Sequence, residues 1–151
     1  MLGPGKKLMF AIEAVLDIAY NAGTLPVQSS EITGRQGIPR RYLEPVLQQL
    51  VRAGILTGMR GPRGGYRLAR ERRRITVGEI VRVVQAMEQG EDAIESNSGH
   101  ALGFQVVRPL WLELREDAMT RLDKVTIEEL CLRAHKAGIP GEFGATLDFT
   151  I

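Results

Sequence analysis

A glycine-rich turn between two short apolar runs is the feature that most constrains the fold of this chain. The turn has the sequence Gly-Pro-Arg-Gly-Gly over residues 61–65, and glycine and proline at this density mark a reversal of the backbone. An apolar run over residues 55–59 precedes it, and residues 66–68 alternate in polarity after it. Runs of this kind on both sides of a turn are typical of antiparallel strands. We therefore expect a β-hairpin near the middle of the chain.

Three helices are expected before the hairpin. Gly23 ends the first helix, Ser29 or Ser30 caps a second over residues 30–36, and Gly37 separates it from a third that starts after Pro39 and ends at Gly54. Helical spacing groups two buried faces, one in the first helix (Ala11, Val15, Ile18, Ala19, Ala22) and one in the third (Leu43, Val46, Leu47, Leu50, Val51). A short helix, a glycine turn, a longer helix and a hairpin together form a winged helix-turn-helix.

Pro45 lies in the second turn of the third helix if that helix begins at Arg40. A proline there removes one backbone hydrogen bond and crowds the carbonyl group four residues earlier. A kink at Pro45 would change how Arg41 and Glu44 face outward, and the sequence leaves this geometry open.

The second half of the chain is expected to be helical. Thr76 with Glu79 and Thr126 with Glu129 have the capping-box spacing, and a long helix is expected over residues 104–124. The fold class is therefore mainly α with a small β-hairpin wing. We divide the chain into a winged helix-turn-helix domain (1–88), a linker (89–103), a dimerisation helix with a following helix (104–137) and a tail (138–151).

Charge is concentrated in the middle of the chain. Residues 35–74 contain eleven arginines and two acidic residues, whereas the flanking segments have net charges of −1 and −6. A cationic region of this density favours a polyanionic partner over a solvated arginine-rich surface. The glycine turn is not a nucleotide-binding loop, because no Gly-Lys-Ser/Thr follows it and it leads into a strand.

The outward face of the third helix carries side chains suited to base recognition. Glu44 can accept from a cytosine amino group, Gln48 can pair with an adenine edge, and Arg40 and Arg41 can contact a guanine or a phosphate. Arg60 and Arg63 of the hairpin suit a narrow minor groove, whereas Arg67, Arg70 and residues 72–74 suit phosphates. The alternative for Glu44 and Gln48 is an ordinary solvated helix face.

Four segments resemble one known family. These are residues 38–44 (IPRRYLE), 50–56 (LVRAGIL), 60–69 (RGPRGGYRLA) and 75–80 (ITVGEI). They resemble the Rrf2 family of winged helix-turn-helix regulators, which includes the IscR, NsrR and CymR types. The resemblance runs from about residue 7 to residue 87 and continues more weakly through residues 110–111 and 125–130. It implies a homodimer, held by the long helix, that acts on a roughly palindromic DNA operator.

The resemblance also assigns residue roles. By that resemblance Tyr42, Glu44 and Arg60 match DNA-contacting positions, with Glu44 discriminating between bases. The full set that we expect to contact DNA is Ser29, Arg40, Arg41, Tyr42, Glu44, Gln48, Arg60, Gly61, Arg63, Arg67 and Arg73.

The chain departs from many members of this family in its cysteines. Those members bind an iron–sulfur cluster through three cysteines before the long helix, whereas residues 88–104 contain none here. Thiolates are the usual cluster ligands, so we expect no cofactor and no metal site. A flexible acidic linker is the favoured interpretation of Glu91, Asp92, Glu95 and His100, with a hard-metal site as the alternative. Cys131 is expected to be a small buried side chain rather than a redox sensor.

The long helix carries the stripe expected at a dimer interface, with packing inside one subunit as the alternative. Its members are Val107, Trp111, Leu114, Ala118 and Leu122. We expect a cytoplasmic homodimeric repressor of transcription whose partner is double-stranded DNA, with any small-molecule or protein effector left open. The alternative is a partner- or metabolite-sensing module for which DNA contact is secondary. An enzyme is not expected, because the two histidines and one cysteine form no catalytic set.

Overall fold

A computed structural model describes residues 5–88 and 101–142. It is mainly helical with one two-stranded antiparallel hairpin, which confirms the predicted fold class. The elements, in order, are α1 (Lys6–Tyr20), α2 (Ser29–Gln36), α3 (Arg40–Arg52), β1 (Leu56–Met59), β2 (Gly65–Leu68), the 3-10 turn η1 (Arg72–Arg74), α4 (Val77–Glu88), the π-helical segment η2 (Gly103–Val107), α5 (Arg108–Leu122) and α6 (Ile127–Lys136). None of the helices in these ranges is both long and apolar enough to cross a membrane.

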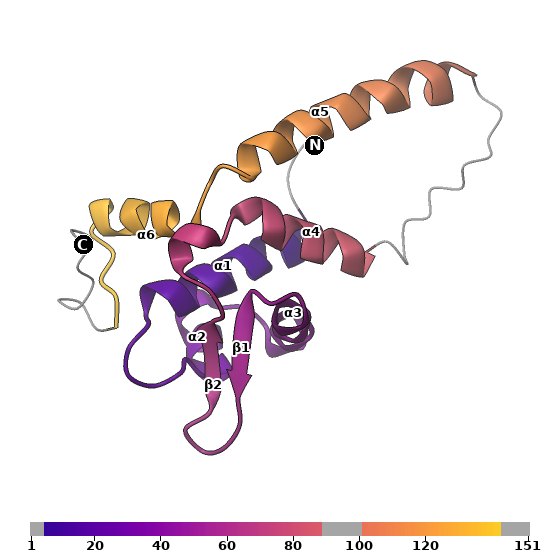
Figure 1. Cartoon of the computed structure of the whole chain (residues 1–151). Coiled ribbons are helices and arrows are strands. Elements are labelled where there is room, and N and C mark those ends of the chain that lie inside the picture. The colour runs from indigo at the N-terminus through magenta and orange to yellow at the C-terminus, as the bar shows by residue number, and fades with distance from the viewer. Residues whose placement is uncertain (1–4, 89–100, 143–151) are drawn as a thin grey trace.

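Helix α1 lies at the centre of the fold and packs against α2, α3, α4, α6 and β2 (Figure 1). Its small side chains Ala11 and Ala14 are fully buried, which allows neighbouring helices to approach closely. The predicted buried faces are confirmed, with two exceptions. Ala22 is exposed because α1 already ends at Tyr20, and Val51 is only half-buried.

A third strand-like segment pairs with the hairpin, and the sequence patterns did not reveal this pairing. Leu56 pairs with Leu68 and Met59 with Gly65 in the antiparallel register. Val27 forms an isolated bridge with Tyr66, in which the two residues exchange backbone hydrogen bonds of 2.9 and 2.7 Å. This bridge fixes the hairpin against the segment that leads into α2.

The start of α2 differs from the expectation, whereas α3 begins directly after Pro39 as expected. Helix α2 begins at Ser29 with Gln28 at its N-cap, not Ser29 or Ser30, because the Glu31 carboxylate accepts a 2.7 Å hydrogen bond from the Gln28 backbone N–H. Helix α3 runs from Arg40 through Pro45 to Arg52 without interruption. The exposed position of Pro45 leaves its ring in solvent.

Helix α6 packs with the N-terminal elements, whereas the sequence grouped it with the long helix. Ile127 and Cys131 are fully buried in the common core, and the Ile127 N–H donates to the carbonyl oxygen of Ile75 at 2.9 Å. Thr76 and Thr126, the caps of α4 and α6, form a β-bridge. The apolar face of α6 therefore completes the core over α1.

Helix α5 projects away from these packed elements (Figure 1). The C-terminal end of α5 is fixed to α4. There, two nitrogens of Arg82 in α4 each donate to one oxygen of Asp123 at 2.7 Å. The helical path starts at Ala101, inside the predicted linker, and passes through η2 before α5 begins at Arg108. Residues 89–100 of that linker lie outside the described residues.

The first residues of the predicted tail pack against α1 and α2. Tyr20 donates a hydrogen bond to the carbonyl oxygen of Ile139, and the Glu142 N–H donates to the side-chain oxygen of Asn21 at 2.7 Å. Glu142 also pairs with Arg35 of α2 at 3.4 Å. The remaining tail, residues 143–151, lies outside the described residues.

Candidate nucleic-acid interface

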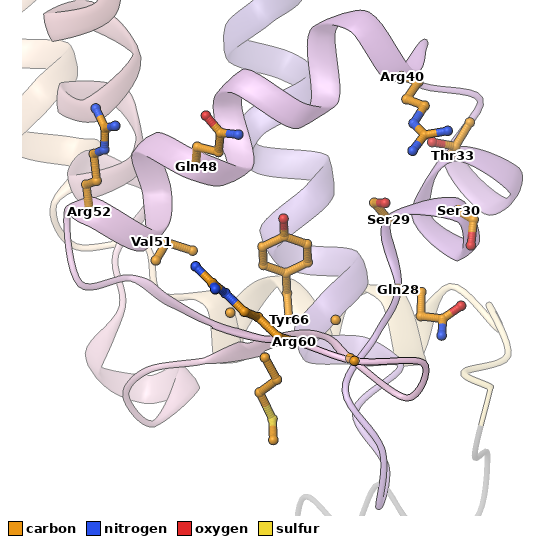
Figure 2. Close-up of a pocket in the computed structure, with 15 residues that line it drawn as sticks. Gln28, Ser29, Ser30, Thr33, Arg40, Gln48, Val51, Arg52, Arg60 and Tyr66 are labelled. Carbon is orange, nitrogen blue, oxygen red and sulfur yellow. The ribbon is translucent and has the colours of Figure 1, made fainter.

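An open groove of about 830 Å³ lies between α2, α3 and the hairpin (Figure 2). Three arginines line it, and among the residues that the structure describes no acidic side chain does. The full lining is Gln28, Ser29, Ser30, Thr33, Arg40, Gln48, Val51, Arg52, Gly58, Met59, Arg60, Gly61, Gly64, Gly65 and Tyr66. The groove thus combines positive charge with hydroxyl and amide donors, which is the donor set that contacts phosphates and base edges in protein–DNA complexes.

Helix α3 contributes one side chain per turn to a polar stripe. Arg40, Glu44, Gln48 and Arg52 are spaced four residues apart, so they follow one another along a slowly turning helix face. Figure 2 shows Arg40 at one end of α3, Arg52 at the other and Gln48 between them. The opposite face is anchored by buried leucine and valine side chains, and this anchoring holds the stripe toward the groove.

The hairpin wall depends on glycines at two close backbone contacts. A Cβ atom at Gly65 would lie 2.4 Å from the carbonyl oxygen of Val27, and one at Gly64 would lie 2.3 Å from that of Met59. Gly65 also has a φ of 154°, which L-residues rarely adopt. The Gln28 side chain donates to the carbonyl oxygen of Pro62 at 3.3 Å, so the turn is joined to the start of α2.

Gly65→Ala is expected to lower the free energy of unfolding by roughly 1–3 kcal/mol, because the new methyl group meets backbone atoms in a conformation restricted to glycine. Urea denaturation followed by circular dichroism measures this change. Gly34→Ala is the matched control, because it lies in α2 with no atom within 4 Å of the added Cβ, and it should keep or raise stability. Equal losses in both variants would contradict the assigned role of Gly65.

The structure brings five of the predicted DNA-contacting residues into the groove. These are Ser29, Arg40, Gln48, Arg60 and Gly61. Sequence reasoning missed Arg52, Ser30 and Thr33 as groove residues. Of these, Arg52 could have been predicted from the sequence, because it follows Gln48 by one helical turn.

The other predicted residues lie around the groove. Glu44 accepts a 2.7 Å hydrogen bond from Arg40. The Arg41 guanidinium lies 4.8 Å from the centre of the Tyr42 ring, and that ring packs against Phe10. Arg63 lines a separate groove of about 220 Å³ beside Arg35 and Glu142.

Arg67 and Arg73 make internal contacts. Arg67 donates to the carbonyl oxygens of Gly23 and Thr24 in the loop after α1. Arg73 pairs with Glu71 in η1, which packs against α6. The contacts of Arg67 favour a structural role for that side chain, in addition to any phosphate contact, whereas the Arg73–Glu71 pair is largely exposed.

The predicted dimerisation stripe is largely uncovered in the single chain. Val107, Trp111 and Leu114 are 57%, 55% and 47% exposed, Ala118 is exposed, and only Leu122 is half-buried. Further apolar side chains are exposed nearby, namely Leu102, Phe104, Val106, Leu110 and Leu112. The predicted stripe is therefore available for an interaction with a partner.

An iron–sulfur cluster does not fit the donors of this chain. Cys131 is the single cysteine of the sequence, whereas clusters are held mainly by several thiolates. Its side chain is fully buried, and this burial raises the pKa of the thiol to about 11, so the reactive and ligating thiolate is scarce at neutral pH. Within residues 5–88 and 101–142, no three His, Cys, Asp or Glu side chains are grouped to hold a metal ion. Glu91, Asp92, Glu95 and His100 lie outside these ranges.

Comparison with known proteins agrees with this geometry. Residues 5–133 match the Rrf2 family, described as an iron-dependent transcriptional regulator. The chain is 36% identical over 124 residues to the HTH-type transcriptional regulator IscR of Klebsiella pneumoniae (strain 342), which covers 80% of this chain and 74% of that protein. It is 33% identical over 126 residues to IscR of Vibrio cholerae, covering 82% and 71%.

Two solved structures are similar along nearly their whole length. IscR of T. potens superposes with a TM-score of 0.72 at 30% identity, over 94% of this chain and 95% of that one. CymR, the global cysteine regulator of B. subtilis, superposes with a TM-score of 0.67 at 27% identity, over 88% and 98%. These relatives are regulators of transcription, not enzymes. The chain therefore belongs to the Rrf2 family of winged helix-turn-helix, DNA-binding transcriptional regulators.

Proposed function

We propose that this protein is a cytoplasmic homodimer that represses transcription by binding a palindromic operator. The observation that carries the proposal is the groove between α2, α3 and the hairpin. Within the described part of the chain it is lined by Arg40, Arg52 and Arg60 and by no acidic side chain. A duplex placed there meets α3 in its major groove and the hairpin at the adjacent minor groove. Two such surfaces in a dimer would enter major grooves about 34 Å apart.

The proposed contacts divide into three kinds. Glu44 and Gln48, in the middle of α3, contact base edges and select the sequence. Ser29, Ser30 and Arg52 contact phosphates and position the helix without selecting a sequence. Arg60, at the end of the hairpin, enters the minor groove, where narrow width attracts arginine. Arg63, on the turn itself, contacts the neighbouring backbone.

The proposed dimer forms through the apolar face of η2 and α5. This face carries exposed apolar side chains that no other part of the described chain covers, including Trp111 and Leu114. A second copy of the same face would remove them from water around a twofold axis, which is the commonest symmetry of protein dimers. The ion pair between Arg82 and Asp123 then fixes the angle between the dimer helix and the DNA-binding elements.

The salt dependence of binding to random duplex DNA tests the proposed interface. If a dimer neutralises about six phosphates in all, log K should fall with log salt concentration with a slope of roughly −5. Arg52→Gln should reduce the magnitude of this slope by about 2 in the dimer, one contact from each protomer. Fluorescence anisotropy with a labelled duplex measures the slope.

Arg133→Gln provides the matched control for charge. Arg133 lies on α6, is paired with Glu129 and does not line the groove, so its removal should leave the slope unchanged. Equal slopes for Arg52→Gln and Arg133→Gln would show that the positive charge acts non-specifically and would contradict the assigned surface. Little binding at any salt concentration would instead favour the partner- or metabolite-sensing module.

A further inference from the structure

Arg40, which lines the groove, forms an ion pair with Glu44 one turn further along α3. The Nε of Arg40 donates to Oε1 of Glu44 at 2.7 Å, and the two side chains are 78% and 47% exposed. The hydrogen bond to Glu44, followed by the carboxylate charge, raises the pKa of Arg40. Among the residues that the structure describes, neither side chain has another hydrogen-bond partner. The two terminal nitrogens of Arg40 and the second oxygen of Glu44 therefore face solvent.

This pair is badly placed for stabilising the helix. Exposed pairs four residues apart contribute little to stability, and the order with the cation nearer the N-terminus is the weaker of the two orders. Arg40 is also the first residue of α3, where the helix dipole disfavours a positive charge. Helix stability therefore gives no physical reason for an arginine at this position, whereas a ligand with matching hydrogen-bonding groups does.

We propose that Arg40 and Glu44 act together to recognise one G·C base pair in the major groove of the operator. The inference rests on the proposed function, in which α3 enters that groove. A G·C pair presents two acceptors, N7 and O6 of guanine, followed by one donor, N4 of cytosine. The free edge of the Arg40 guanidinium supplies two donors for guanine, and the second oxygen of Glu44 supplies the acceptor for cytosine. Their existing hydrogen bond already places donors and acceptor side by side.

The Arg40–Glu44 ion pair disfavours an A·T base pair at that position. An A·T pair presents acceptor, donor and acceptor in turn, followed by the thymine methyl group. The guanidinium then meets the adenine amino group, and the carboxylate meets an oxygen that cannot donate. Arg40 also offsets the repulsion between the Glu44 carboxylate and the DNA phosphates, so Glu44 depends on Arg40 to enter the groove.

Selection from a randomised duplex pool with the full-length wild-type protein first identifies the preferred operator. Each G·C pair of that operator is then changed singly to A·T, and binding is measured by fluorescence anisotropy for wild type, Arg40→Met, Glu44→Gln and the double variant. At one G·C pair in each half-site, wild type should lose roughly tenfold or more in affinity. Both single variants should lose that preference at the same position, and the double variant should show no further loss.

Arg52→Met is the matched control on the same helix. It removes an equal charge from the other end of α3, so it should weaken binding to every duplex while the preference for G·C at that position remains. Circular dichroism of each variant establishes that α3 and the remaining helices are intact. Because Arg40 and Glu44 are 78% and 47% exposed and make no other hydrogen bond among the described residues, these variants are expected to fold as wild type does.

The outcomes separate the inference from the proposed function. If wild type selects no preferred sequence, the proposed function fails and this inference fails with it. If wild type has an operator but Arg40→Met keeps the full G·C preference, only the inference is overturned. Loss of preference at two different positions in Arg40→Met and Glu44→Gln would likewise show that the residues act separately.

Discussion

Trp111→Asp is expected to convert the proposed dimer into a monomer and to lower operator affinity by roughly 100-fold or more, because linked binding sites gain about 10²–10⁴ in affinity over single ones. Trp111 is 55% exposed on α5, between Val107 and Leu114 on the predicted stripe. Buried tryptophans dominate many interfaces and cost roughly 2 kcal/mol or more when removed. The aspartate adds a charge that would be buried without a partner.

Sedimentation velocity at micromolar concentration measures the oligomeric state, and anisotropy measures operator binding. Leu112→Asp is the matched control, because Leu112 is equally exposed on the same helix at 56% but lies outside the predicted stripe. It should leave the dimer intact. If Trp111→Asp remains a dimer, the assignment of α5 as the dimerisation helix is wrong. If both variants dissociate, the interface extends beyond the stripe.

Asp17→Asn is expected to lower the free energy of unfolding by about 3 kcal/mol, at the low end for breaking a buried ion pair because one partner is partly solvated. Asp17 is 2% exposed in α1. Its two oxygens accept from Arg35 at 2.9 and 2.8 Å and from Gln36 at 2.8 Å. Asparagine keeps the shape but replaces one acceptor oxygen with a donor and leaves the Arg35 charge without its main partner.

Chemical denaturation followed by circular dichroism measures the loss. Glu142→Gln is the control, because Glu142 contacts the same Arg35 at 3.4 Å but is 54% exposed, and exposed pairs contribute only about 0–1 kcal/mol. The contacts from Asp17 also hold the last turn of α2. The first turn of the same helix places Ser29 and Ser30 at the groove. Asp17→Asn should therefore weaken operator binding as well. Unchanged stability in Asp17→Asn would show that the buried carboxylate does not hold α2.

The elements that could be predicted from the sequence are those determined by neighbouring residues. Helix faces, capping boxes and the glycine turn depend on spacings of a few residues, so the hairpin, the helices and the caps Thr76 and Thr126 were predictable. The arginine-rich region also lies within one continuous stretch of chain. Much of the candidate groove, including Arg40, Gln48 and Arg60, follows from that local information together with the family resemblance.

Contacts between distant segments were decided only by the tertiary structure. Val27 meets Tyr66, α6 covers α1, and Arg67 reaches the carbonyls of Gly23 and Thr24, and each contact joins residues about forty or more positions apart. Local periodicity shows that a helix face is apolar but not which element covers it. The same limit applies to Arg67, because an arginine has the same charge in every context and only packing determines which acceptors lie within its reach.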